Sequence, residues 1–145
     1  MATKEALVSK GRAAGVLVIT PQGTPLVREP NKPAPHYWKI PAGKCEDAET
    51  VEQCALRELF GEIGVALREE DLKLPCEAER GSHTLTVFLA DLPFLPRMRS
   101  VGDEGEEIAI FPTADILTME DFLPSQRPIL RKLLASHPLS TQAAK

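Results

Sequence analysis

Two glutamates four residues apart are the first side chains in this sequence whose types and spacing could do chemistry. On a helix, Glu58 and Glu62 would lie on one face with their Cβ atoms about 6 Å apart. Two carboxylates at that separation can share a hard divalent cation such as Mg²⁺. The same pair also fits an ordinary solvated helix face, so the spacing alone leaves both interpretations open.

The residues from Gly43 to Val65 extend this pattern. They resemble the box of the Nudix hydrolases, which runs Gly, five residues, Glu, seven residues, Arg-Glu-hydrophobic, one residue, Glu-Glu, one residue, Gly-hydrophobic. Eight of the nine specified positions agree, and the ninth is Gly61, where the box has Glu. A match over a motif this long carries a small risk of arising by accident.

The resemblance implies both a fold and an activity. The fold is an α/β/α sandwich of the α/β (α+β) class, a mixed sheet flanked by helices, formed by a single domain over residues 1–145. The activity is hydrolysis of the pyrophosphate of a nucleoside diphosphate linked to another group, by attack of water at phosphorus. The cofactor is a divalent ion, Mg²⁺ or in its place Mn²⁺, which neutralises phosphoryl charge and makes water easier to deprotonate.

The resemblance also implies which side chains do this chemistry. Glu58 and Glu62 would be metal ligands or, for one of them, the base that activates water. The Ala42 carbonyl would be a further metal ligand, and Arg57 belongs with the catalytic residues by its place beside Glu58.

Other positions of the box imply structural roles. Glu49 and Arg57 would form an ion pair that holds the preceding loop against the helix, although an ordinary surface pair has the same composition. Gly43 and Gly64 would shape the two ends of the motif.

Gly61 is the departure from the box. Gly in place of Glu removes an anionic ligand and costs about 1 kcal/mol of helix propensity relative to Ala, so one metal site should be weakened. Either the remaining carboxylates still hold one or two ions, with help from an acidic loop, or the domain is a catalytically impaired nucleotide-binding or regulatory module. We favour the first interpretation, because the helix keeps the other groups that the chemistry needs.

Charged residues outside the box add further candidates. The acidic stretch from Asp103 to Glu107 lies where members of the family often bring an extra carboxylate, so Glu104 and Glu107 are candidate metal ligands. A solvated acidic turn is the alternative. Arg28, Lys39 and Lys44 are candidate substrate-binding residues, because cationic side chains donate charge-assisted hydrogen bonds to phosphates, although each is also typical of an exposed surface.

Hydrophobic periodicity predicts the elements that position these groups. Residues 13–19 are apolar and β-branched, which indicates a buried strand. A Pro-Gln-Gly-Thr turn leads into a returning strand at 25–28, so we expect a hairpin. The proline-rich stretch 29–36 is predicted to be a surface loop that forms the rim of the substrate site, and 37–40 a short extended segment.

The helix that carries the two glutamates has the clearest pattern. Apolar residues recur at every fourth position from Val51 to Ile63, which gives one buried stripe. Thr50 with Gln53 matches a capping box, and Gly64 stands where a left-handed cap ends a helix. We therefore expect a helix bounded by Thr50 and Gly64.

The second half of the chain reads as strands followed by a helix. We expect strands at 72–80 and 83–90 joined as a hairpin, another strand at 107–111, and a helix at about 125–136. Hairpins imply antiparallel pairing, and the helices need a sheet to cover their apolar stripes. Residues 138–145 are expected to fray.

Composition narrows the class of partner. The chain has 145 residues, 43% apolar and 26% charged, which is typical of one soluble domain. A net charge of −4 argues against binding duplex nucleic acid through a basic face, and the longest apolar run is too short to cross a bilayer. Three cysteines without paired spacing indicate reduced thiols in a cytoplasmic protein. The predicted partner is a small nucleotide substrate, and the resemblance adds the pairing of two copies as a homodimer.

Overall fold

The computed structural model of the chain describes residues 11–137, so the predicted frayed tail, 138–145, lies outside the described residues. This part of the chain forms β1 (Gly11–Ile19), β2 (Thr24–Arg28), β3 (Ala42–Lys44), α2 (Val51–Ile63), η1 (Glu69–Asp71), β4 (Lys73–Glu79), β5 (His83–Asp91), β6 (Glu107–Phe111), η2 (Thr113–Thr118), η3 (Pro124–Gln126) and α3 (Arg127–Ala135), the η elements being short 3₁₀ helices.

β1 lies inside a four-stranded sheet with the order β3-β1-β5-β4. It pairs antiparallel with β3 and parallel with β5, the latter from Gly11 opposite His83 to Ile19 opposite Asp91. β4 adds the other edge, antiparallel to β5. The mixed sheet expected from the resemblance is confirmed, with β1 and β5 as its parallel pair. A parallel pair requires a long crossover, which residues 20–82 supply.

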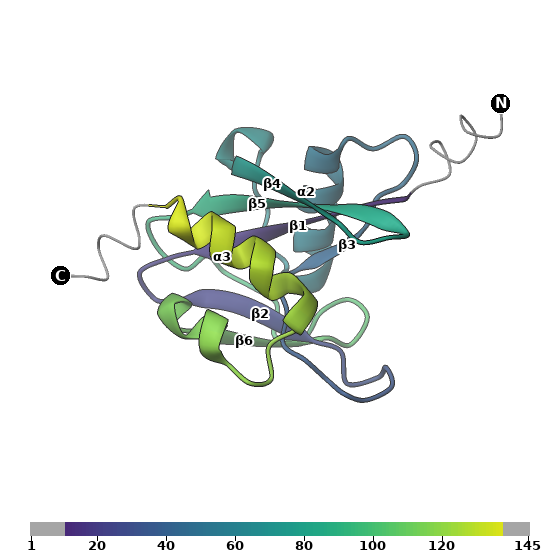
Figure 1. Cartoon of the computed structure of the whole chain (residues 1–145). Helices are drawn as coiled ribbons and strands as arrows, with labels where there is room; N and C mark the ends of the chain where they lie inside the picture. The colour runs from purple at the N-terminus through teal and green to yellow at the C-terminus, as the bar shows by residue number, and fades with distance from the viewer. Residues whose placement is uncertain (1–10, 138–145) are drawn as a thin grey trace, which may run out of the picture.

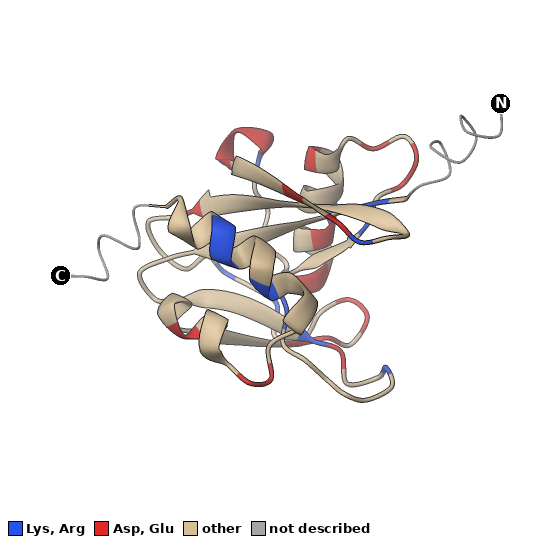
Figure 2. Cartoon of the chain, viewed as in Figure 1, with Lys and Arg blue, Asp and Glu red and all other residues tan. Residues whose placement is uncertain are grey.

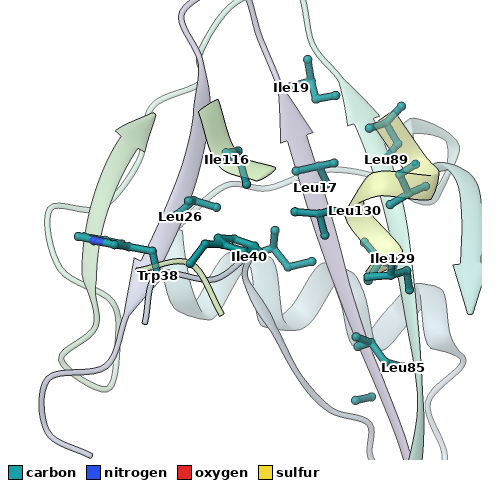
Figure 3. Close-up of a cluster of buried hydrophobic side chains, with 14 residues drawn as sticks. Leu17, Ile19, Leu26, Trp38, Ile40, Leu85, Leu89, Ile116, Ile129 and Leu130 are labelled. Carbon is teal, nitrogen blue, oxygen red and sulfur yellow. The ribbon is translucent and has the colours of Figure 1, made fainter. Parts of the chain in front are cut away.

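The two faces of this sheet carry separate halves of the core. Side chains alternate between the faces of a strand. In β1, Ala14, Val16 and Val18 therefore pack with α2, whereas Leu17 and Ile19 pack with α3. Figure 1 shows the two helices on opposite sides of the sheet, and Figure 3 shows the cluster on the α3 side. Complete burial of such a side chain contributes about 1.5–3 kcal/mol, so both helices are held firmly against the strands.

α2 begins and ends where the sequence predicts. The Thr50 hydroxyl accepts a hydrogen bond from the Gln53 N–H, and the Gln53 side chain accepts one from the Thr50 N–H, both at 3.0 Å. This is the predicted capping box. At the other end Gly64 has φ 79°, a left-handed conformation that Gly adopts without the steric cost of a Cβ.

The predicted hairpin between β1 and β2 is wrong. The turn itself forms, with a pair of backbone hydrogen bonds between Thr20 and Gly23, but β2 then leaves the sheet and pairs antiparallel with β6. β5 pairs along the whole of one edge of β1 and β3 pairs with residues 13–15 on the other edge, while β2 pairs over its full length with β6. β2 and β6 therefore form a separate two-stranded sheet, which we call the ribbon.

The remaining elements agree with the sequence apart from one strand. β4 and β5 form the expected antiparallel pair, and α3 covers most of the predicted segment after a 3₁₀ turn. β3 was not expected, since three residues after a proline show no periodicity. Within residues 11–137 no helix is long and apolar enough to cross a membrane.

Candidate active site

A cleft of about 720 Å³ opens beside the polar face of α2. Its walls come from α2, from β3, from the segment after β2 and from the segment before β6. Figure 2 shows acidic positions of α2 and of the segment before β6 on the same side of the molecule. Nine residues singled out in the sequence line the cleft: Lys39, Ala42, Gly43, Lys44, Arg57, Glu58, Gly61, Glu62 and Glu104.

Glu58 lies against the backbone of β3. A Cβ placed on Gly43 would overlap the Glu58 carboxylate, so this carboxylate occupies space that is open only because residue 43 has no side chain. The Glu58 side chain is 17% exposed, which leaves it accessible from the cleft. Gly43 thus sets how closely the helix and the strand approach.

Arg57 connects three parts of the site. Its Nε and Nη2 donate to the two carboxylate oxygens of Glu49 at 2.6 and 2.9 Å. Its Nη1 donates to Glu58 Oε2 at 2.9 Å, and Nη2 also donates to the carbonyl of Lys44 at 3.0 Å. One planar guanidinium therefore ties the loop before α2 and the end of β3 to the helix, and it orients Glu58. The Arg57 hydrogen bonds lower the pKa of Glu49 to about 2.

Glu62 is the most deeply placed acid of the predicted pair. It is 7% exposed, and its Oε1 accepts a 3.3 Å hydrogen bond from the Ala42 N–H. Burial, together with the neighbouring Glu58 and Glu106 carboxylates, raises the pKa of Glu62 to about 9, against an opposing effect of Lys39. Among the described residues Glu62 forms no ion pair. A carboxylate buried in this way favours a cation beside it.

The segment after β2 brings a second group of charges to the cleft. Glu29 bridges two lysines, with 2.6 Å from its Oε1 to Lys39 Nζ and 3.1 Å from its Oε2 to Lys32 Nζ. Burial acts to raise the pKa of Glu29, but the two lysines outweigh it and the pKa is lowered. Glu29 thereby holds Lys39 and Lys32 at the cleft.

The segment before β6 contributes residues that the sequence did not single out. Glu106 is 3% exposed and lines the cleft, and its Oε1 accepts from the Glu104 N–H at 3.0 Å. The carboxylates predicted here were Glu104 and Glu107. Successive side chains of a strand point to opposite faces, so Glu106 and Glu107, where β6 begins, point to opposite sides. Only this alternation could have identified Glu106 rather than Glu107 as the residue in the cleft. Asp103 and Arg99 also line the cleft.

Two predicted residues lie outside the lining of the cleft. Arg28 donates to Glu107 Oε1 at 2.6 Å across the ribbon, and its guanidinium lies 4.5 Å from the centre of the Trp38 ring. Trp38 in turn meets Phe111 edge to face, with ring centres 5.1 Å apart. In this structure Arg28 and Glu107 therefore partner each other. Glu49 acts from behind the cleft through its ion pair with Arg57, and Gly64 acts there by ending α2.

The donor atoms of the cleft fit a magnesium-type ion. Within residues 11–137 no three His, Cys, Asp or Glu side chains converge on one point, so the cleft presents neighbouring carboxylates rather than a closed cage. Mg²⁺ suits this arrangement, because it keeps several waters and binds through one or two carboxylates plus substrate phosphates. The protein would supply two of the ligands of such an ion: the Glu58 carboxylate, which occupies the space beside Gly43, and the buried Glu62 carboxylate.

Comparisons with known proteins agree with this geometry. The NUDIX domain family matches residues 9–133. No curated protein sequence matches the chain.

Solved structures share the fold at low sequence identity. A MutT structure reported for Aliivibrio salmonicida and Vibrio cholerae has a TM-score of 0.72 at 20% identity, covering 88% of this chain and 98% of that one. A bifunctional NMN adenylyltransferase/ADP ribose pyrophosphatase from Francisella tularensis has a TM-score of 0.74 at 22% identity, covering 88% of this chain and 41% of that one. An Ap4A hydrolase from C. elegans has a TM-score of 0.66 at 21% identity, covering 86% and 96%.

The resemblance seen in the sequence is thus confirmed from two sides, by the family match over most of the chain and by the shared architecture. On these grounds the chain belongs to the NUDIX domain family.

Proposed function

We propose that this protein hydrolyses the pyrophosphate bond of a nucleotide-linked substrate in a reaction that depends on Mg²⁺ or Mn²⁺. The observation that carries the proposal is the position of Glu62, a buried carboxylate without a cationic partner among the described residues, beside Glu58 in a cleft whose rim carries lysines. The carboxylates inside the cleft suit a metal ion, and the lysines at its rim suit a phosphate chain lying over that ion.

Each group of the cleft has a definite task in this reaction. Glu58 and Glu62 would hold the ion, with the Ala42 carbonyl as a further ligand, and the ion when bound neutralises phosphoryl charge and makes water easier to deprotonate. Arg57 keeps Glu58 in place through its hydrogen bond. Glu106 adds a third carboxylate to the cleft from the segment before β6.

The chemical step is an exchange of bonds at phosphorus. The water oxygen bonds to phosphorus while the bridging P–O bond breaks, and one carboxylate of the Glu58 and Glu62 pair takes the proton of the water. Lys39 and Lys32 face the negative charge that moves to the leaving phosphate. Catalysis of this type consists mainly of positioning and charge stabilisation.

The class of substrate follows from the cleft and from the names of similar structures. The cleft is open and strongly charged, so it suits a phosphate chain better than an apolar ligand. A MutT protein, an ADP ribose pyrophosphatase and an Ap4A hydrolase share the fold, and the Francisella tularensis enzyme was solved with AMP and a Mn ion. A nucleoside diphosphate joined to a further phosphate, sugar or nucleotide is therefore the substrate class that we propose.

Gly61 favours a second candidate, a module that binds nucleotides without turning them over. A panel of nucleoside triphosphates, ADP-ribose and dinucleoside polyphosphates with Mg²⁺ or Mn²⁺ separates the two. Turnover that disappears in Glu62→Gln and in Glu58→Gln supports the enzyme. Nucleotide binding without turnover of any member of the panel supports the module and overturns the proposed reaction.

We also propose that the protein acts in the cytoplasm. All three cysteines are free in this structure, which suits a reducing compartment. Fractionation of cells that express the tagged protein tests the location. Pairing of two copies stays a prediction that sedimentation of the purified protein can decide.

A further inference from the structure

Asp103 occupies the space in front of Gly61. A Cβ built on Gly61 would lie 3.0 Å from Asp103 Oδ2 and 3.7 Å from Oδ1. The Asp103 carboxylate thus lies against the place where a side chain at position 61 would start. Both residues line the cleft.

Position 61 neighbours Glu58 on the surface of α2. Residues three and four apart on a helix are neighbours with Cβ atoms about 5–6 Å apart, and position 61 is three residues from Glu58. A carboxylate against position 61 therefore joins the acidic face of α2, even though Asp103 comes from a loop about forty residues further along the chain.

Backbone hydrogen bonds fix this loop against the helix. The Asp103 N–H donates to the Gly61 carbonyl at 3.1 Å, and the Arg99 N–H donates to the Ile63 carbonyl at 2.9 Å. Further along the loop the Gly102 N–H donates to the Glu106 carbonyl at 2.9 Å. The position of Asp103 is thus set by the main chain on both sides, and within residues 11–137 its carboxylate forms no hydrogen bond or ion pair with another side chain.

We infer that Asp103 supplies the divalent ion of the cleft with the anionic group that Gly61 does not provide. This inference rests on the proposed function, because it concerns the same ion. Two features of the structure point to a cation there: the Asp103 carboxylate lies against position 61 of α2, and Glu62, which lines the same cleft, is more than nine-tenths buried without an ion pair among the described residues.

The test measures binding of Mn²⁺ and Mg²⁺ by titration calorimetry in the absence of substrate, with Asp103→Asn as the main variant. Asn keeps the size of the side chain and the backbone hydrogen bond, so the fold is preserved. The expected result is a dissociation constant about tenfold higher, in the range seen when groups around a metal are removed. Asp115→Asn removes the same charge from an exposed position outside the cleft and is the matched control.

Two further measurements separate a contribution to the site from a general charge effect. At 0.5 M KCl long-range charge effects are screened, and the loss caused by Asp103→Asn should persist there. The double variant Gly61→Glu with Asp103→Asn restores a carboxylate from the helix, and it should recover most of the lost affinity. Gly61→Glu alone places a second carboxylate against Asp103 and should lower the unfolding temperature without metal.

The outcomes distinguish this inference from the proposed function. If Glu62→Gln weakens metal binding while Asp103→Asn and Asp115→Asn both leave it unchanged, Asp103 has no part in the site, and the proposed function stands. The same holds if the Asp103→Asn effect vanishes at high salt. If Glu62→Gln also binds metal like the original chain, the cleft is not the metal site and both proposals fail.

Discussion

The Glu58 carboxylate lies in the space that a side chain at Gly43 would fill. This contact joins the strand that carries Ala42 to the helix that carries both acids. The two walls of the cleft can meet this closely only while residue 43 is glycine.

Gly43→Ala should therefore displace Glu58 while the core stays intact. We expect the rate of hydrolysis to fall at least a hundredfold, because a shift of about 1 Å in a positioned group has that effect. Steady-state kinetics on the best substrate of the panel measures the change. Gly11→Ala is the matched control, since its Cβ would meet only an ordinary 3.6 Å contact with His83. Equal activity of both variants would show that Glu58 need not lie against residue 43.

Arg57 positions Glu58 rather than touching the reacting atoms, and Arg57→Lys tests this role. Lys keeps the charge but cannot reproduce the fork that reaches Glu49, Glu58 and the Lys44 carbonyl together. We expect kcat to fall about 10–100-fold, with a small change in KM, as for other groups that orient metal ligands. A change confined to KM would instead indicate that Arg57 contacts the substrate.

The ion pair of Glu49 with Arg57 should make the folded state less stable at low pH. The pKa of Glu49 is held at about 2 by the hydrogen bonds of Arg57, against an ordinary value of 4.5. Its contribution to stability is present above pH 4.5 and is lost as the pH falls towards 2. Denaturant unfolding between pH 6 and 2.5 should show a shallower acid limb for Glu49→Gln than for the original chain. Parallel curves for the two proteins would contradict this account.

Glu62 should make the metal-free protein less stable at higher pH. Its pKa is raised by burial from 4.5 to about 9, so the folded state binds a proton that the unfolded state has released. This contribution is complete below pH 4.5 and is lost as the pH rises to about 9. In the presence of a chelator the unfolding temperature should fall over this range, and Glu62→Gln should flatten the slope. Added Mg²⁺ should raise the unfolding temperature most at the alkaline end, where the carboxylate is charged.

Arg28 and Lys39 give a paired test of substrate binding. Arg28 stacks on Trp38 and pairs with Glu107, so Arg28→Ala should lower the free energy of unfolding by about 1 kcal/mol and leave KM unchanged. Lys39 lines the cleft, so Lys39→Ala should raise KM several-fold. A raised KM in Arg28→Ala would return Arg28 to the substrate site, as the sequence alone suggested.

Local rules predicted the helix of the site well, because its start, stripe and end each depend on neighbours in sequence. Thr50, Gln53 and Gly64 behave as their residue types predict. The pairing of β1 could not be obtained in this way, since its partners come from residues 42–44 and 83–91. A short turn after a strand predicts a hairpin, although the strand after the turn can pair elsewhere, as β2 does. The acidic loop was located, but the choice among Asp103, Glu104, Glu106 and Glu107 depends on the direction in which the loop enters β6.

The ribbon of β2 and β6 brings the lysine-bearing segment and the acidic segment to the same cleft. Arg28 is paired with Glu107 at the end of the ribbon, so the segments that follow β2 and precede β6 leave it together and meet over the cleft. The acids of α2 belong to the other sheet layer and are anchored independently by the core. Exchange of the segment that follows β2 between relatives would redirect the proposed enzyme towards a different leaving group, while the acids of α2 and of the segment before β6 are inherited unchanged, which makes the end of β2 the natural place for new specificities to evolve or be engineered.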